Sequence, residues 1–442
     1  MEESFFFTSY LRIFNNLYGR SYENQGYLNT SFFLFILTIK IFLSRRRAVP
    51  FLTFPISPSQ NAMGYTGTSL PIDDPYGFLL NPAQLGFTSQ QNNFSLMVYP
   101  SKVKLWGFDN FRIKGLAFNL GYNFKDIIGI PISVGFGFAN PELSLYYGKI
   151  NNNEDWEDKD NYDAYSLGVG IDYYVQFSAG ITYKNIDSKI SNYGYSQEIA
   201  PYTDKANVKA FDFGFLLNIP IIKLFDNNLS FDAFENTKVN PFINFSVGYS
   251  QSNIGDEIHY VDPAQSDPLS RAARLGYGIS TGADVNFEYN TIRFIGIDFT
   301  VDAEDYLIKT KTEYGPGYTI TTFDGYQSFI GDIKIGKNIL QVKSDNKVTV
   351  HSGLQATLLE TIIIKTGRIK NTDNVSRKTD GFEIRTKGLL KFLNFITKNT
   401  AIDFISNHFD LRYYYSSYSV AEGLETNIKG FAIYFQNLNS LF

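Results

Sequence analysis

Apolar and small polar residues alternate along most of this chain. Residues 164–173 place a large apolar side chain at every second position: Tyr165, Leu167, Val169, Ile171 and Tyr173. The positions between them hold alanine, serine, glycine and aspartate, and 115–123, 211–218 and 243–250 follow the same pattern. Because successive side chains of a strand point to opposite faces, the alternation predicts strands with one apolar face and one small, polar face. Strands of this kind form a transmembrane barrel, with lipid on one side and a polar lumen on the other.

Turn-like segments divide the region 93–442 into fourteen predicted strands. They are expected at 93–100, 113–123, 131–149, 162–173, 176–187, 207–219, 241–251, 272–287, 291–303, 347–357, 361–370, 381–391, 404–416 and 426–436. An even number allows both ends of a single-chain antiparallel barrel to lie on one side. The predicted fold class is therefore all-β, a transmembrane antiparallel β-barrel of about 14 strands.

The connections between these strands alternate in length. Short turns such as 174–175 and 358–360 are expected on the periplasmic side. Long polar connections such as 151–161 and 304–346 are expected as outer loops. The connection 221–240 is an exception, because it is long but falls on the short-turn side. Within the last long loop, 318–339 alternates as a strand pair does and is a candidate outer hairpin.

The pattern changes upstream of the first strand. Residues 48–92 are rich in Gly, Pro and Asn and show neither the helical period nor the strand period. We therefore predict that they form a plug segment inside or across the periplasmic mouth of the barrel. The turn Asn81-Pro82-Ala83 suits a plug, because an Asn side chain can satisfy backbone donors of a tight turn. Unpaired polar groups inside a lumen would be costly. We interpret the turn as structural, with a gate that moves with ligand as the alternative.

Residues 1–47 are predicted to be an export signal with an N-terminal extension. The apolar run 31–43 is shorter than the ~20 residues of a transmembrane helix but suits the apolar region of a secretory signal. A long stretch precedes this run, and Arg45-Arg46-Arg47 follows it where small residues are expected, so a tail without function is the alternative. The predicted regions are thus 1–47, 48–92 and 93–442.

Composition is consistent with a barrel and excludes several chemistries. The chain has 41 Phe, 31 Tyr and 35 Gly but only 2 Trp. Aromatic rings suit lipid-facing and interfacial positions, and small residues suit a lumen. The absence of cysteine excludes disulfides, thiolate metal sites and cysteine nucleophiles. A net charge of -5 with scattered basic residues gives no basic stripe, which argues against nucleic-acid binding.

The sequence offers no catalytic or metal-binding constellation. His259, His351 and His408 are the three histidines, and they lack the spacing of a zinc site. His351 and Ser352 are adjacent on a predicted strand, so they point to opposite faces and cannot act as base and nucleophile. The acidic run 151–163 lacks the central glycine of an EF-hand loop, so we interpret it as a solvated outer loop. We predict no enzyme activity, cofactor or metal.

A series of short motifs resembles the PorV/PorQ-type outer-membrane proteins, which belong to the wider FadL-like barrel superfamily. The chain has Phe51-Leu52, NAMGYTG from Asn61, DDP from Asp73 and NPAQLG from Asn81, where the family pattern runs roughly FLRIG…ARAxGMGGA…ADDA…xNPAGL. Weaker similarities continue at 267–277, 351–367 and 409–415. The double glycine of the family is spread over 64–67 here. The residues that carry the plug motif are Gly64, Gly67, Asp73, Asp74, Asn81, Pro82 and Ala83.

The resemblance implies a non-enzymatic protein of the bacterial outer membrane, in contact with its lipid. In the PorV branch it implies a component of type IX-like protein secretion and surface attachment, with exported cargo and other secretion components as partners. We take this function as the first hypothesis. A FadL-like channel for hydrophobic small molecules is the alternative, and a membrane-embedded lipid hydrolase is disfavoured by the lack of Ser–His geometry. An apolar pocket between plug and outer loops would favour transport, whereas a blocked lumen with apolar outer loops would favour partner binding.

Overall fold

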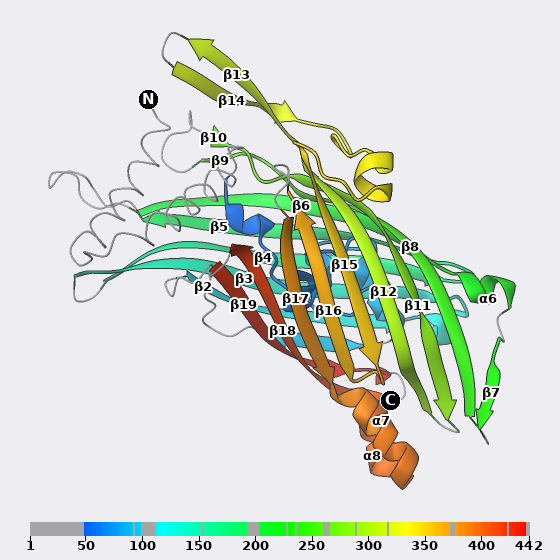
Figure 1. Cartoon of the computed structure of the whole chain (residues 1–442). Helices are drawn as coiled ribbons and strands as arrows, with labels where there is room; N and C mark the ends of the chain where they lie inside the picture. The colour runs from blue at the N-terminus through cyan, green and yellow to red at the C-terminus, as the bar shows by residue number, and fades with distance from the viewer. Residues whose placement is uncertain are drawn as a thin grey trace. The chain divides into compact units, whose positions relative to one another are not determined.

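Fourteen antiparallel strands close into a barrel in the computed structural model of the chain (Figure 1). The structure describes residues 48–91, 93–98, 111–151, 154–191, 203–226, 229–234, 237–259, 266–287, 290–315, 318–371, 376–421 and 424–438. The barrel strands are β1 (Phe94–Val98), β2 (Phe111–Asn123), β3 (Ile132–Asn151), β4 (Glu154–Asp172), β5 (Gln176–Ser191), β6 (Thr203–Pro220), β8 (Thr237–Gly255), β11 (Ala272–Phe287), β12 (Asn290–Tyr306), β15 (Val348–Leu358), β16 (Ile362–Lys370), β17 (Ser376–Arg385), β18 (Phe409–Ala421) and β19 (Leu424–Phe435). The predicted export signal at 1–47 lies outside the described residues.

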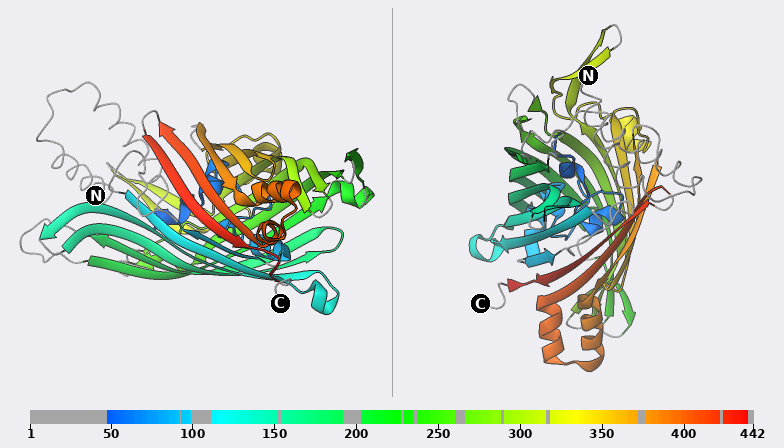
Figure 2. Two further views of the ribbon diagram at one scale, coloured as in Figure 1. Left: turned by 90° about the horizontal axis from the view of Figure 1, so that it is seen from below. Right: turned by 90° about the vertical axis from the view of Figure 1, so that its left-hand side faces the viewer.

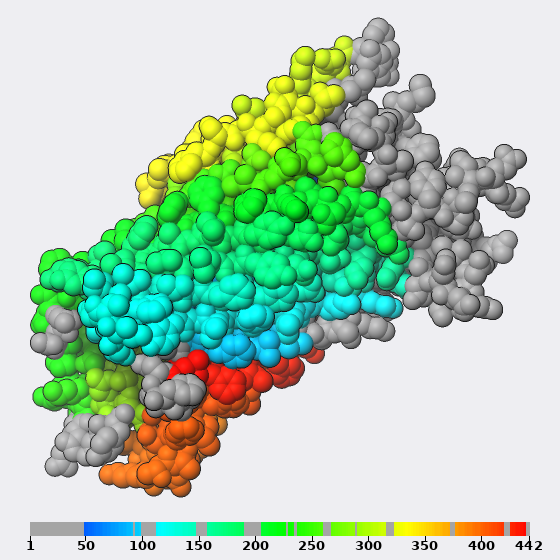
Figure 3. Space-filling view, turned by 180° about the vertical axis from the view of Figure 1, so that it is seen from behind, coloured from blue at the N-terminus to red at the C-terminus, as the bar shows by residue number. Residues whose placement is uncertain are grey.

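Each of the fourteen barrel strands pairs with the barrel strands before and after it in the chain, and one further pairing closes the ring. The first strand, β1, pairs with β2 on one side and with the last strand, β19, on the other. Strand β11 pairs with both β8 and β12, so each of the fourteen described strands has a partner strand on both sides. The predicted fold class, an antiparallel barrel of fourteen strands with an N-terminal plug, is confirmed. Figure 3 shows β2 to β8, cyan to green, as one continuous wall.

Side-chain exposure follows the predicted alternation of strand faces. Val247, Ile279 and Ile297 are exposed on the outer face, at 36%, 40% and 45%. Their neighbours Ser246 and Asp298 are buried on the inner face. An antiparallel barrel with an apolar exterior is the architecture of outer-membrane proteins, because strands can cross a bilayer only when every backbone group is paired. The barrel is therefore a bacterial outer-membrane protein.

Several strands extend further than the sequence pattern predicted. The acidic run 151–163, expected as a solvated loop, belongs mostly to β4 and pairs with β3. Glu142 of β3 forms ion pairs with Lys159 of β4 and with Lys114 of β2. Beyond the bilayer both faces of a strand can meet water, so its alternation of apolar residues ends although its backbone pairing continues. The loop prediction was wrong for this reason.

A helical hairpin replaces the adjoining ends of two predicted strands. The segments 381–391 and 404–416 were expected as strands, but β17 ends at Arg385 and β18 begins at Phe409. Between them lie α7 (Thr386–Thr397) and α8 (Thr400–His408). Apolar residues in α7 follow one another in pairs, at 389–390, 392–393 and 395–396, which suits the helical period better than the strand period. None of the helices in the described ranges combines the length and the apolarity needed to cross a bilayer.

The remaining connections are short elements at the two ends of the barrel. On the side of the short turns lie α5 (Lys125–Ile128), α6 (Ile221–Phe225) and β7 (Phe231–Phe234). On the other side lie β9 (Ile258–His259), β10 (Ser266–Asp267) and the π-helix η4 (Ile335–Leu340). The strands β13 (Ile308–Gly315) and β14 (Tyr318–Tyr326) form a hairpin that belongs to a separate compact unit. The candidate hairpin at 318–339 was therefore placed about one strand too late.

Candidate functional site: the plug and the barrel wall

The plug is a chain of short helices joined by turns. Its elements are η1 (Pro50–Thr53), α3 (Pro58–Ala62), η2 (Gly77–Leu79), α4 (Gln84–Thr88) and η3 (Ser89–Gln91). Proline begins both η1 and α3, and Ser57 caps α3 by accepting a hydrogen bond from the Gln60 N–H. Helix α3 packs against β16 to β19 and α4 against β2 to β5. The segment thus spans the lumen from one wall to the other (Figure 2).

Side chains of the plug satisfy much of its own backbone. The Asn81 Oδ1 accepts a hydrogen bond from the Ala83 N–H at 3.0 Å. The Gln84 Nε2 donates to the carbonyl oxygens of Gly67 and Leu70, both at 2.8 Å, while its Oε1 accepts from the Ile72 N–H. These bonds make the irregular backbone tolerable at full burial, because buried polar groups without partners are costly.

Glycines of the wall let the plug backbone approach the strands directly. A Cβ atom added at any of a ring of wall positions would overlap plug atoms: Gly121, Gly135, Gly168, Gly170, Gly180, Gly214, Gly248, Gly353, Gly367 and Gly381. At Gly367, for example, the overlap would be with the backbone of Met63 and Gly64. We call these ten positions the glycine ring. It brings the plug into close contact with nine of the fourteen barrel strands.

One wall carboxylate fastens the plug loop at 67–69. The Asp302 Oδ2 accepts hydrogen bonds from the N–H groups of Gly67 and Thr68, both at 2.9 Å. Its Oδ1 accepts from the Ser69 hydroxyl at 2.9 Å. Hydrogen bonds to a charged acceptor are stronger than neutral ones, especially where water is excluded. We call such a set of wall-to-plug contacts a latch, and Asp302 forms the latch of this loop.

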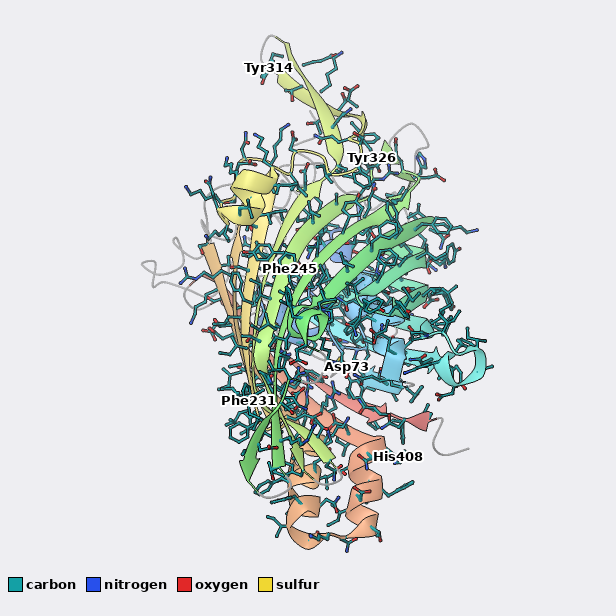
Figure 4. All side chains as sticks on the ribbon, turned by 90° about the vertical axis from the view of Figure 1, so that its right-hand side faces the viewer. Asp73, Phe231, Phe245, Tyr314, Tyr326 and His408 are labelled. Atoms are coloured by element: carbon teal, nitrogen blue, oxygen red, sulfur yellow. The ribbon has the colours of Figure 1, made fainter. Side chains whose placement is uncertain are left out.

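A second latch holds the other half of the plug. The Arg412 guanidinium of β18 pairs with Asp73 at 2.7 Å and donates to the Asp73 carbonyl oxygen at 3.1 Å. The Tyr434 hydroxyl donates to the same carbonyl at 3.0 Å. Asp410 pairs with the Nε of Arg412 at 2.6 Å. In Figure 4 the labelled Asp73 lies within the ring of strands, where these groups meet.

The structure places six of the seven residues of the predicted plug motif against the wall. The Gly64 N–H donates to Thr379 Oγ1 at 2.9 Å, and its positive φ of 73° suits glycine. The Gly67 N–H is held by Asp302 and Asp73 by Arg412, as described above. The Asn81 Nδ2 donates to the carbonyl oxygens of Thr68 and Phe215. The Ala83 carbonyl accepts from the Ser178 hydroxyl, and Pro82 lies against Gly180.

Asp74 differs from the other motif residues because it bonds within the plug. Its carboxylate accepts hydrogen bonds from the Ser57 hydroxyl and from the Tyr76 N–H. Burial raises the pKa of this carboxyl to about 6, although both hydrogen bonds oppose the rise. The carboxyl therefore titrates under mildly acidic conditions.

The sequence motif missed the wall side of the interface. Asp302 and Arg412 carry the two latches, and Arg274 pairs with Glu304 at 2.8 Å while donating to the Tyr65 carbonyl. A charged residue on an otherwise small and polar strand face was a usable signal for these positions. Which plug atoms they would meet depended on the stagger of the strands.

The three histidines lie on three different elements, β15, α8 and β9. In the lumen, the His351 Nδ1 contacts the Gly64 carbonyl at 2.8 Å and its Nε2 contacts Glu304 at 3.1 Å. The His408 Nδ1 contacts the Phe404 carbonyl in α8, and His259 belongs to β9. Within the described ranges, no group of His, Asp and Glu is arranged to hold a metal ion.

A pocket lies between the plug and the outer half of the wall. Its lining combines apolar and aromatic side chains with polar ones: Leu52, Phe54, Ile56, Leu79, Leu80, Tyr76 and Tyr162 lie beside Thr53, Gln60, Ser252, Asn253 and Ser270. The charged groups in the lining are compensated, since Lys184 pairs with Asp212 at 2.7 Å and Arg274 with Glu304. The cavity is about 20 Å³, which is room for one water molecule. The plug closes the lumen at this point.

Comparisons with known proteins give weak structural similarities. No family profile matches the chain, and no curated protein matches it in sequence. It is similar to the toluene transporter TbuX of Ralstonia pickettii, with 10% identity and a TM-score of 0.39 over 86% of this chain and 97% of that one. It is also similar to a FadL homologue of Pseudomonas aeruginosa (9%, 0.37, 87% and 99%) and to the P. putida toluene transporter TodX (10%, 0.34, 86% and 97%). The fold assigned above rests on strand pairing and closure, and nothing in these similarities singles out the PorV/PorQ branch.

Proposed function

We propose that this protein is an outer-membrane channel for hydrophobic small molecules and that the plug is its gate. The observation that carries the proposal is the pocket on the outer side of the plug, where apolar and aromatic side chains lie beside polar ones and the charged groups are paired. Such a lining suits an apolar ligand, because the ligand would leave no buried charge without a partner. The known transporters of toluene and of monoaromatic hydrocarbons named by the comparisons are consistent with this substrate class.

The size of the cavity adds a requirement to the proposal. A cavity of about 20 Å³ does not admit a hydrocarbon, so the plug must shift before a molecule can pass. The latches at Asp302 and Arg412 are made of hydrogen bonds and ion pairs, which can break and re-form. Transport therefore depends on the movement of the plug relative to the wall.

A reversible disulfide tether tests this dependence. Because the chain has no native cysteine, only the introduced pair can form a disulfide within it. The hydroxyls of Ser69 in the plug and Thr300 in β12 lie 3.2 Å apart. The variant Ser69→Cys/Thr300→Cys can join plug to wall by a disulfide. The matched control joins two strands: the hydroxyls of Ser166 and Thr182 lie 2.8 Å apart in β4 and β5. The control Ser166→Cys/Thr182→Cys leaves the plug free.

The readout is entry of the hydrophobic dye N-phenyl-1-naphthylamine into Gram-negative cells that carry each protein. We expect uptake several times faster than in vector cells for the unmodified protein and for the oxidised control. We expect vector-like uptake for the oxidised tether, restored by a reductant. Dye entry no faster than in vector cells, with the barrel assembled, would refute the channel. Equal uptake by the oxidised tether and the control would refute the plug as gate.

The secretion role implied by the PorV/PorQ resemblance is a second candidate, favoured by one observation. Three apolar side chains on the outer segment 327–347 are strongly exposed: Phe329, Ile335 and Leu340. Replacing all three by serine should abolish co-purification of an identified exported protein from mild-detergent extracts, if they form a docking surface. The control Ile127→Ser removes an exposed apolar residue from a periplasmic turn. Loss of the partner in both variants, or in neither, would count against this role.

A further inference from the structure

The hairpin α7–α8 has its polarity reversed relative to a helix of a soluble protein. The face of α7 that is buried against the barrel carries Gly388, Lys391 and Asn394. The face that is exposed carries five large apolar side chains: Leu389, Phe392, Leu393, Phe395 and Ile396. In α8 Ser406 is buried while Phe404 and Ile405 are exposed. A surface helix in water normally turns its apolar stripe inward and its polar face outward.

Polar contacts fix this orientation and prevent the hairpin from rolling over. The Lys391 Nζ donates to the Thr291 carbonyl at 2.6 Å and pairs with Glu360 at 2.9 Å. The Asp403 Oδ1 accepts from the Asn394 Nδ2 at 2.7 Å and from the Asn290 Nδ2 at 3.2 Å. The apolar face therefore stays exposed as long as these contacts hold.

The exposed face continues the apolar exterior of the barrel at its periplasmic end. Helix α7 packs against β12 and β18, and the ring of Phe395 lies 4.5 Å from that of Phe287 in β11. Nearby strand ends are also apolar and exposed, including Phe294, Leu358 and Ile362. Seen from the periplasmic end, the hairpin, marked by His408, extends beyond the strand wall rather than across the mouth (Figure 4).

We propose that the hairpin lies in the periplasmic leaflet of the outer membrane, with its apolar face among the lipid acyl chains. Interfacial helices bury an apolar face at the boundary between headgroups and acyl chains, as this position requires. Lipid is the occupant that the geometry favours, because the exposed face is continuous with the lipid-facing belt of the same barrel. The short polar contacts to the turns then hold the hairpin at the depth of the strand ends.

Cysteine labelling in lipid nanodiscs tests this placement. Ile396→Cys and Phe404→Cys, at positions that are 61% and 55% exposed, would each carry an environment-sensitive nitrobenzoxadiazole dye. Ile364→Cys on the outer face of β16 is the lipid-facing control, and Lys125→Cys in the turn helix α5 is the water-facing control at the same end. The discs contain phosphatidylethanolamine and phosphatidylglycerol, part of it with an acyl-chain nitroxide. Heat-modifiable mobility on gels confirms that each variant is folded.

Quenching by the nitroxide and by aqueous iodide separates the possible occupants. We expect both hairpin sites to be quenched by the nitroxide as strongly as Ile364→Cys and to be shielded from iodide. Iodide quenching like that of Lys125→Cys would overturn the proposal, since it would leave the face in water or free for a protein partner. Shielding from both quenchers would point to a second copy of the chain in the disc and would also overturn it.

Discussion

Asp302 holds three consecutive plug residues with one carboxylate. The variant Asp302→Ala removes these acceptors, and each hydrogen bond to a charged group contributes about 1.5–3 kcal/mol. We expect hydrogen exchange of the amides at 66–70 to quicken by one to several orders of magnitude while the strands stay protected. The control Asp298→Ala removes a lumenal carboxylate of the same strand that bonds Gln355 instead. Similar exchange in both variants would mean that Asp302 is not a latch.

Gly367 shows what the glycine ring contributes to stability. In Gly367→Ala the added methyl group would overlap the backbone of Met63 and Gly64, so plug or strand must shift. Overpacking of this kind costs about 1–3 kcal/mol, and we expect a lower melting temperature. At Gly336 an added Cβ meets nothing within 4 Å, so Gly336→Ala should melt close to the unmodified protein. A Gly367→Ala protein as stable as this control would contradict the close fit.

The carboxyl of Asp74 predicts a pH dependence of stability. Its pKa is raised to about 6 in the folded protein, so between pH 4 and 6 the folded state binds more protons than the unfolded state. Stability from this group is therefore greatest below pH 4, falls as pH rises to about 6 and is constant above that. Denaturant unfolding at several pH values should show this decline, and Asp74→Asn should remove it. An unchanged pH slope in Asp74→Asn would refute the assignment.

Sequence motifs identified the plug residues but not their partners. Asn81 and Ala83 form a local turn, so their bond depends only on neighbours in sequence. The bond from Gly67 to Asp302 spans 235 positions. Its prediction would need the stagger of every strand between them, which periodicity does not fix. The role of the motif in gating stays a prediction that the tether experiment addresses.

At the scale of strands, the two faces should respond differently to charge. Val247→Arg places a cation on the exposed outer face of β8, which should cost about 2–4 kcal/mol near the bilayer midplane. Ser280→Arg, on the lumenal face of β11 beside Asp298, should cost far less because the carboxylate can pair with it. Folding yield into lipid vesicles compares the two. Equal yields would mean that the faces are misassigned.

Ser246 shows where the expectation for the inner face needs correction. Its place in the alternation of 243–250 predicts a side chain that faces a polar lumen, and it is instead fully packed beside the contact between Gly278 and the plug residue Leu70. An arginine at this position would have to displace the plug. Alternation in the sequence gives the direction of a side chain but not the space in front of it.

The hairpin α7–α8 shows that a sequence pattern can indicate a helix without indicating which of its faces meets the protein. Its helical period was present in the sequence, but its polar stripe faces the protein and its apolar stripe faces outward. A pattern that is interpreted with water as the surroundings assigns these faces the wrong way round. The environment on each side of an element has to be known before its pattern can be oriented.

At the scale of the whole molecule, the plug determines whether the barrel conducts. Deleting residues 48–91 should remove the elements that fill the lumen and leave a hydrated passage lined by polar groups. We expect large, steady conductance in planar lipid bilayers, against little or none for the complete protein. Heat-modifiable mobility checks that the deletion variant is folded. A folded deletion variant that conducts as little as the complete protein would show that wall side chains alone close the lumen.

Strand number, closure and the presence of a plug could be predicted from the sequence, because they depend on counting periods and comparing connection lengths. The helices α6, α7 and α8 could not, because these segments lie at the membrane edge, where neither water nor lipid alone sets the pattern.

The pairing of the first strand with the last has a consequence for assembly. Among the described residues, five of β1 form this seam, Phe94 to Val98 against Phe435 to Phe431. The strands of this seam cannot pair until β19 has left the export machinery. The plug precedes β1 in the chain. The plug must therefore already rest against the open sheet when the seam closes, or it is left outside for good. Closure of the barrel and enclosure of the plug are then one step of assembly, and the pairing of β1 completes that step.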